Sequence, residues 1–208
     1  MDKIQLETPT LILGGGIAGS GRRAVLKELV KYVSDAFLIH KDTINGAFLS
    51  TPNPSDTGIH AYKLSGERIP VNDPYYNMYV RLQSYRCMLE LAKDNLLAGK
   101  HPILDGNFTK EIRAGYLDEV VGPFFEDVSH QTKLLFFHAD EATIRRRLTD
   151  RYNEWDAAKL ESEETWRRFL EEQPILPSEL ERSPHLKVDT NLPLEENIQK
   201  ILNYLSLE

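Results

Sequence analysis

A glycine-rich loop joins the first apolar run of this chain to its first amphipathic stretch. The run Thr10-Leu11-Ile12-Leu13 predicts a buried strand, and apolar residues at positions 25, 26, 29, 30 and 33 have helical spacing. The residues that follow Leu13 read Gly-Gly-Gly-Ile-Ala-Gly-Ser-Gly, and the frame Gly16-x-x-x-x-Gly21 has the spacing of loops that cradle phosphate. Glycines let backbone N–H groups turn inward, and the helix N-terminus adds the positive end of a dipole. The pattern favours an anion-binding loop; an ordinary glycine-rich turn is the alternative interpretation.

Further apolar runs predict four more strands, at residues 36–39, 102–104, 133–137 and 186–188. Amphipathic stretches predict helices at residues 74–98, 110–121, 141–152, 161–172 and 194–205. Asp73-Pro74 has the form of a helix N-cap followed by proline, and Gly99 has that of a C-cap. Strands that alternate with such helices are typical of an α/β fold with a parallel sheet and helices on both faces. Ligands of these sheets bind beyond the carboxyl ends of the strands, so functional residues should directly follow strands.

Composition excludes several classes of protein. The 208 residues include 32 acidic and 25 basic side chains, a formal net charge of −7, which argues against dedicated nucleic-acid binding. Cys87 is the single cysteine, so an intrachain disulfide is excluded and a reducing compartment is favoured. The first residues lack the layout of a signal peptide, and every apolar run is far shorter than the roughly 20 residues of a membrane span. We therefore expect one cytoplasmic domain over residues 1–208 that does not associate with membranes.

Five local features together resemble P-loop kinases, in particular the small bacterial ATP-binding kinases related to zeta toxins, chloramphenicol phosphotransferases and gluconate kinases. They are the glycine loop, His40-Lys41-Asp42 after the second strand, Ile103-Leu104-Asp105-Gly106 after the third, the arginine-rich helix Arg145 to Arg151, and the closing strand and helix. The resemblance implies a three-layer P-loop kinase-like fold with a five-stranded parallel sheet and a helical lid. It also implies transfer of the γ-phosphoryl group of ATP to a hydroxyl of a small-molecule acceptor, with Mg²⁺ as the metal.

The resemblance assigns nucleotide binding to the loop, at Gly16, Gly19, Ser20, Gly21, Arg22 and Arg23. In the family the loop ends in Gly-Lys followed by Ser or Thr, whereas this chain has two arginines. Arg22 keeps a positive charge that can meet the β- and γ-phosphates, but its guanidinium is a rigid planar fork and not a compact ammonium group. Arg23 replaces the hydroxyl that binds Mg²⁺ in the family, and a guanidinium cannot bind a metal. Three interpretations stay open: other groups hold Mg²⁺, Arg23 partly substitutes for it, or the site no longer transfers phosphate.

Two carboxylates directly follow predicted strands. In the resembling kinases, an acid at the place of Asp42 faces the acceptor hydroxyl, and such a carboxylate can orient the hydroxyl or accept its proton. Asp105 resembles the acid that holds Mg²⁺ after the third strand, and we expect it to be the metal ligand. The alternatives are that Asp42 caps a turn into residues 43–49 and that Asp105 belongs to an Asp-Gly turn. We interpret His40 as a structural residue at the end of a strand.

Three further arginines are candidates through the resemblance. A spacing of four places Arg147 and Arg151 on one side of a helix, and lid arginines of the resembling kinases stabilise charge on the transferring phosphoryl group. The alternative is a salt-bridged surface helix. Arg113 could reach the acceptor or be a solvated charge. We expect residues 140–172 to form a lid-like segment, with 161–172 as a solvated helical face, and residues 50–78 to be an acceptor-binding insertion.

The leading hypothesis is therefore an ATP-dependent small-molecule kinase. A second hypothesis is a catalytically degenerate protein that kept the P-loop fold and binds nucleotide or phosphate. A third is an enzyme that uses the two arginines to hold a phosphorylated substrate other than ATP. The sequence carries no signature of a particular acceptor or of an oligomeric state.

Overall fold

A single parallel sheet forms the centre of the computed structural model, which describes residues 3–70, 73–151 and 154–207. Its strands are β1 (Thr10–Gly15), β2 (Ala36–His40), β3 (His101–Asp105), β4 (Gln131–His138) and β5 (His185–Asp189). In the described residues the five strands pair in the order β2-β3-β1-β4-β5, and every pairing is parallel. The predicted α/β fold with a five-stranded parallel sheet is therefore confirmed.

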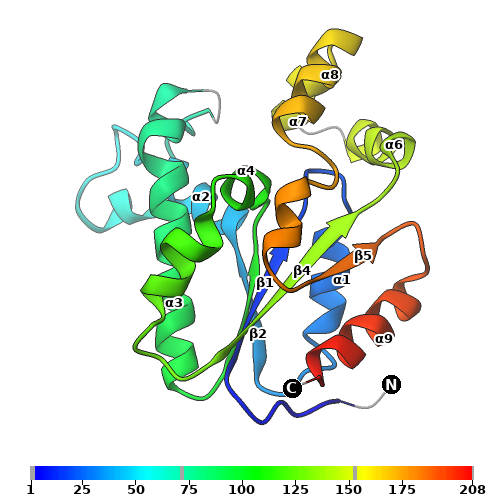
Figure 1. Ribbon diagram of the computed structural model, residues 1–208. Coiled ribbons are helices and arrows are strands. Elements are labelled where there is room, and N and C mark those ends of the chain that lie inside the picture. The colour runs from blue at the N-terminus through cyan, green and yellow to red at the C-terminus, as the bar shows by residue number, and fades with distance from the viewer. Residues whose placement is uncertain (1–2, 71–72, 152–153, 208) are drawn as a thin grey trace.

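Helices connect the strands and cover both faces of the sheet (Figure 1). The α-helices are α1 (Arg22–Leu29), α2 (Lys41–Leu49), α3 (Arg81–Leu97), α4 (Thr109–Arg113), α5 (Gly122–Phe124), α6 (Glu141–Arg151), α7 (Glu154–Leu160), α8 (Glu163–Glu172) and α9 (Leu194–Leu205). Two 3₁₀ segments, η1 (Gly58–Lys63) and η4 (Ser178–Arg182), and two π-helical segments, η2 (Tyr76–Val80) and η3 (Leu117–Val121), complete the described elements.

Alternating side chains of the central strand β1 hold the three layers together. Leu11 and Leu13 belong to a buried cluster with Met88 of α3, on one face of the sheet. Ile12 belongs to a second cluster, with Leu26 of α1 and residues of α9 on the other face. Because successive strand side chains point to opposite faces, an apolar strand of this kind needs a helical layer on each side.

Two helices differ from the expectation drawn from the sequence. No helix was predicted at residues 43–49, but they belong to α2, which starts directly after β2, so Asp42 lies in the first turn of a helix. The helix expected over 110–121 is interrupted, because Gly115 adopts a φ of +78° between α4 and η3. Residues 74–75, η2 and α3 follow one another as helical structure, and the predicted N-cap is confirmed, because Asp73 Oδ1 accepts the Tyr75 N–H at 2.8 Å. At the other end the C-cap of α3 is Ala98, and Gly99 follows it with a φ of +74°.

Helices α6, α7 and α8 lie beyond the carboxyl ends of β1 and β4 (Figure 1). Trp166 and Phe169 of α8 are buried against Ile144 and Leu148 of α6 and Ile17 of the glycine loop. The expectation of a fully solvated helix at 161–172 is therefore wrong, because one side of α8 packs on α6. Residues 152–153 of the predicted lid-like segment and 71–72 of the predicted insertion lie outside the described residues.

Among the described parts of the chain, none of the helices has both the length and the apolar character needed to cross a bilayer. The cytoplasmic location stays a prediction.

Candidate functional site

A cleft of about 1020 Å³ lies at the carboxyl ends of the central strands, between the glycine loop, α2, α3, α4, α6 and α7. Its volume is slightly above the usual range of ligand pockets, about 300–1,000 Å³. Three acidic side chains line it, against nine basic ones: Arg22, Arg23, Lys41, Arg68, Arg81, Lys110, Arg147, Arg151 and Lys159. In a chain of formal net charge −7, this local excess of positive charge suits a polyanionic ligand.

The glycine loop connects β1 to α1 as the sequence predicts. Gly16 and Gly21 have φ values of +136° and +78°, a region that side chains disfavour. A Cβ on Gly16 would lie 2.3 Å from the carbonyl oxygen of Phe137, so the loop geometry requires glycine there. Helix α1 begins at Arg22, and the N–H groups of a first helical turn have no partner inside their helix. The buried Ser20 hydroxyl also has no hydrogen-bond partner among the described residues. The loop therefore offers donors to an anion.

Asp105, at the end of β3, is the centre of an ion-pair cluster. Its side chain contacts Arg22 Nε through Oδ1, and its Oδ2 lies 3.1 Å from Arg23 Nε and 2.7 Å from His40 Nδ1. The strand register brings these groups together, because His40 of β2 and Gly14 of β1 are both paired with Asp105. His40, interpreted from the sequence as structural, therefore supports the carboxylate expected to hold metal.

The electrostatics of this cluster keep Asp105 ionised. The residue is only 1% exposed, and burial alone would raise the pKa of its carboxyl group. The charge of Arg22 and the hydrogen bonds from Arg22, His40 and Arg23 outweigh that effect and lower the pKa from 3.8 to about 2. The carboxylate is thus a fixed negative charge that holds two guanidiniums beneath the loop.

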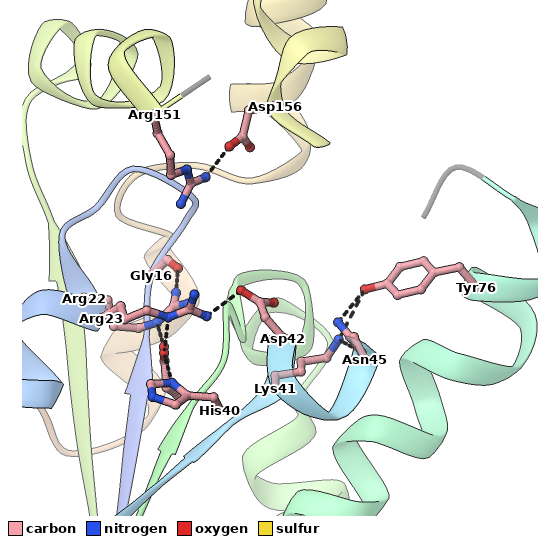
Figure 2. Close-up of polar contacts among 11 residues, drawn as sticks. Gly16, Arg22, Arg23, His40, Lys41, Asp42, Asn45, Tyr76, Arg151 and Asp156 are labelled. Carbon is pink, nitrogen blue, oxygen red and sulfur yellow. Dashed lines mark hydrogen bonds and ion pairs between the residues drawn. The ribbon is translucent and has the colours of Figure 1, made fainter. Parts of the chain in front are cut away.

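The two arginines reach different walls of the cleft (Figure 2). Arg22 folds back and donates through Nη1 to the carbonyl oxygen of Gly16, and its side chain is 13% exposed. Arg23 points across to α2, where its Nη2 lies 2.5 Å from Oδ2 of Asp42. Side chains of Arg23 and Asp42 are 42% and 49% exposed, so both are accessible to a ligand.

The donor set does not fit a directly bound Mg²⁺. Magnesium takes about six oxygen ligands in octahedral geometry, usually one or two carboxylates with water and phosphate. Here guanidiniums pair with Asp105 and Asp42, and Arg23 stands where the resembling kinases have a hydroxyl. The described residues contain no group of three or more His, Cys, Asp or Glu side chains placed to hold a metal. Asp105 therefore binds arginine where a metal was expected.

Arg147 holds the glycine loop in place. Its Nη1 and Nη2 each lie 2.8 Å from an oxygen of Thr190, the hydroxyl and the carbonyl, and Nη1 also lies 3.3 Å from the carbonyl oxygen of Gly19. Thr190 in turn donates its hydroxyl to the carbonyl oxygen of Ser20 at 2.7 Å. Arg147 thus links α6, the loop and the segment after β5, and also lines the cleft.

Arg151 lines the same cleft one turn further along α6, as the predicted spacing requires. It pairs with Asp156 of α7, which also accepts Lys159 Nζ at 2.5 Å (Figure 2). Asp156 is buried, and its carboxylate pairs with both of these cations at the rim of the cleft. Arg113 is placed differently: it donates to the Glu172 carbonyl at 2.9 Å, at the end of α8, and is not part of the cleft lining. Its role in acceptor binding stays a prediction.

The wall opposite the loop contains a buried lysine that the sequence did not single out. Lys41 is 6% exposed, and its Nζ lies 3.3 Å from both Asn45 Oδ1 and Tyr76 OH (Figure 2). The same ammonium lies 4.6 Å from the ring centroid of Tyr85. Burial lowers the pKa of Lys41 from 10.5 to about 8, although Asp42 and Glu111 act in the opposite direction. In the sequence, the only indication of a role for Lys41 was its position directly before Asp42.

Comparisons with known proteins bear on the family and the fold of the chain. The family profile described as the AAA domain matches residues 11–174. No curated protein sequence matches the chain.

Solved structures of the same fold cover nearly the whole chain. A candidate kinase from Chloroflexus aurantiacus has a TM-score of 0.65 at 17% identity, over 95% of this chain and 96% of that one. A sugar kinase from Janibacter has a TM-score of 0.58 at 16% identity, over 95% and 94%. A gluconokinase from Sinorhizobium meliloti has a TM-score of 0.54 at 16% identity, over 98% and 94%. At such identities the likeness concerns the fold, and the predicted P-loop kinase-like fold is confirmed.

Proposed function

The chain belongs to the AAA-domain family, and on that basis we propose that it transfers the γ-phosphoryl group of ATP to a hydroxyl of a small molecule. One observation carries the proposal. The loop that presents phosphate donors and the carboxylate that can accept a hydroxyl proton meet in one cleft, where Arg23 and Asp42 are 2.5 Å apart. In-line phosphoryl transfer requires that the γ-phosphate of the nucleotide and the hydroxyl of the acceptor be held next to each other in one site.

The nucleotide phosphates bind at the arginine end of the cleft. Backbone N–H groups from Gly19 to Arg22 and the Ser20 hydroxyl provide donors, and the guanidiniums of Arg22 and Arg23 provide charge. Arg151 faces the same space from α6 and covers the phosphates on the side away from the sheet. Positive groups held in advance around the γ-phosphate stabilise the charge of the transition state without reorganisation.

The acceptor hydroxyl binds beside Asp42. Asp42 accepts the hydroxyl proton, the acceptor oxygen forms a bond to the γ-phosphorus, and the bond from that phosphorus to the β–γ bridging oxygen breaks. ADP leaves with the bridging oxygen, and the proton stays on Asp42 until solvent removes it. Arg23 contacts Asp42 in the described structure, so it can also contact the phosphoryl group as it moves between the two oxygens.

The acceptor occupies the wall formed by α2, η2, α3 and α4. This wall presents Lys41, Tyr76, Arg81 and Glu111, a set of hydrogen-bonding and charged groups suited to a small hydroxylated molecule. The described residues of the predicted insertion, 50–70 and 73–78, lie on the same side of the molecule (Figure 1). Its role in acceptor binding is part of the proposal.

A second candidate function has one specific observation in its favour. The Arg22 guanidinium is turned toward Asp105 and the Gly16 carbonyl, which are protein groups. A protein that binds nucleotide or phosphate without transferring it would keep the cleft and could keep this arrangement.

One experiment separates the two functions. The full chain is incubated with ATP and a pooled panel of sugars, sugar acids, polyols and amino alcohols, and mass spectrometry follows products heavier by one phosphoryl group. Transfer to an acceptor, lost in Asp42→Asn, supports the kinase. Binding of ATP with no phosphorylated product from any class of hydroxyl compound supports the second function.

A further inference from the structure

Two guanidiniums, those of Arg22 and Arg23, stand where the resembling kinases have the phosphate-binding lysine and the metal-binding hydroxyl. Arg22 and Arg23 both contact Asp105, and Arg23 also contacts Asp42, so both carboxylates that follow strands β2 and β3 are already paired with cations. Together the arginines carry two positive charges, the same formal charge as Mg²⁺. We propose that this arginine pair takes the place of Mg²⁺, so that the cleft binds the triphosphate of ATP in its metal-free form. The inference rests on the proposed function only in taking ATP as the ligand.

The arginine pair can bind phosphate without giving up its carboxylates. A guanidinium has five N–H groups. Arg22 uses Nε and Nη1 for Asp105 and Gly16, and Arg23 uses Nε and Nη2 for Asp105 and Asp42. These contacts leave Nη2 of Arg22 and Nη1 of Arg23 with their hydrogens, and both side chains line the cleft. Forked N–H donors match phosphate oxygens well, which favours arginine over other cations at such a place.

The same contacts work against a metal. Asp105 is buried and has a charged or polar partner at both of its oxygens. A divalent cation would have to displace Arg22 or Arg23 from the carboxylate, and the displaced guanidinium would remain within the loop, where it repels the metal. Proteins usually bind Mg²⁺ directly through only one or two carboxylates, so the affinity for the metal depends strongly on each of them. The site therefore disfavours the metal through charge as well as through missing ligands.

An alternative account is that the arginines serve the fold alone. In that case they neutralise Asp105, and the phosphates still arrive with Mg²⁺ held by water and phosphate oxygens. The two accounts differ in the metal dependence of nucleotide binding, which a purely structural pair would not change.

The test is calorimetric titration of the full chain with ATP, once with excess EDTA and once with excess Mg²⁺. We expect affinity in EDTA that is equal to, or up to about tenfold tighter than, the affinity with Mg²⁺. Affinity at least about tenfold weaker in EDTA overturns the inference. If ATP binds in neither condition, both the proposed function and this inference are overturned. If ATP binds without metal but no acceptor is phosphorylated, the proposed function fails and this inference stands.

A variant assigns the effect to the arginine pair. Arg23→Ser removes one guanidinium and returns a hydroxyl to the loop. We expect ATP affinity in EDTA to fall by about tenfold or more, whether or not Mg²⁺ restores it. Arg168→Ser, which removes an exposed arginine from α8, is the matched control and should leave both affinities unchanged. Unchanged affinity of Arg23→Ser in EDTA, with an unchanged melting temperature, would overturn the inference.

Discussion

Arg23 joins the phosphate loop to the carboxylate after β2, because its Nη2 lies 2.5 Å from Oδ2 of Asp42. One residue belongs to the first turn of α1 and the other to the first turn of α2. Both are close to half exposed, so solvent screens their attraction and the pair adds little to stability. Its importance is positional: a cation and a proton acceptor are held at the point where nucleotide and acceptor would meet.

Asp42→Asn should abolish most transfer and leave nucleotide binding in place. The amide keeps the size of the side chain but cannot accept a proton, and loss of a general base reduces turnover by about 100- to 10,000-fold. The measurement is the rate of acceptor phosphorylation beside the dissociation constant for ATP. Asp118→Asn, at an exposed position of η3, is the control and should keep full activity. Full activity of Asp42→Asn would remove Asp42 from the mechanism.

Asp105 should make stability depend on pH in the acid range. Its folded-state pKa is about 2, against 3.8 ordinarily, so the stabilisation is complete above about pH 5 and is lost as pH falls toward 2. The size is about 2 kcal/mol, from about 1.4 kcal/mol for each unit of the shift. Urea unfolding of the parent and of Asp105→Asn between pH 7 and pH 2 checks this. The difference in unfolding free energy should shrink as the pH falls, and a constant difference would contradict it.

Lys41 should make stability depend on pH in the alkaline range. Its pKa is about 8 in the folded protein and 10.5 ordinarily, so the unfolded chain binds more protons between these values. Stability of the parent therefore rises relative to Lys41→Met as the pH increases from 8 to 10.5, by up to about 3 kcal/mol. Chemical denaturation at several pH values measures the difference. If Lys41 also contacts the acceptor, the variant should raise the KM for the acceptor and leave ATP affinity unchanged.

Arg147 and Thr190 should be coupled in stability. Both nitrogens of the guanidinium end contact Thr190, so removing either partner loses the same contacts. We expect Arg147→Gln and Thr190→Val each to destabilise the fold by about 1–3 kcal/mol. The double variant should lose less than the sum, with a coupling of about 0.5–3 kcal/mol. Melting and urea unfolding of the four proteins in the cycle test this, and additive effects would show that the contact does not hold the loop.

Local patterns in the sequence were sufficient for most of the architecture. Apolar runs and helical spacing located all five described strands and the long helices, because burial on both faces of a parallel sheet needs continuous apolar segments. The glycine loop could also be recognised in the sequence, because its positive φ angles favour glycine over other residues. Helix α2 was missed because Asn45 and Gly46 interrupt its helical pattern, and its stability comes from packing against α3 and η2.

The contacts among the side chains around the cleft were decided by the tertiary structure. The sequence placed Asp42 and Asp105 after strands and Arg22 and Arg23 at the end of the loop, which determined that they lie at one edge of the sheet. It did not determine that the arginines contact those carboxylates, because Arg22 and Asp105 are 83 positions apart and meet only through the register of β1 with β3. The burial of Lys41 against η2 and α3, and the contact of Arg147 with Thr190, also join segments that are far apart in the sequence. Side-chain pairing across a sheet is set by which strands lie side by side, and no local pattern in the chain records that order.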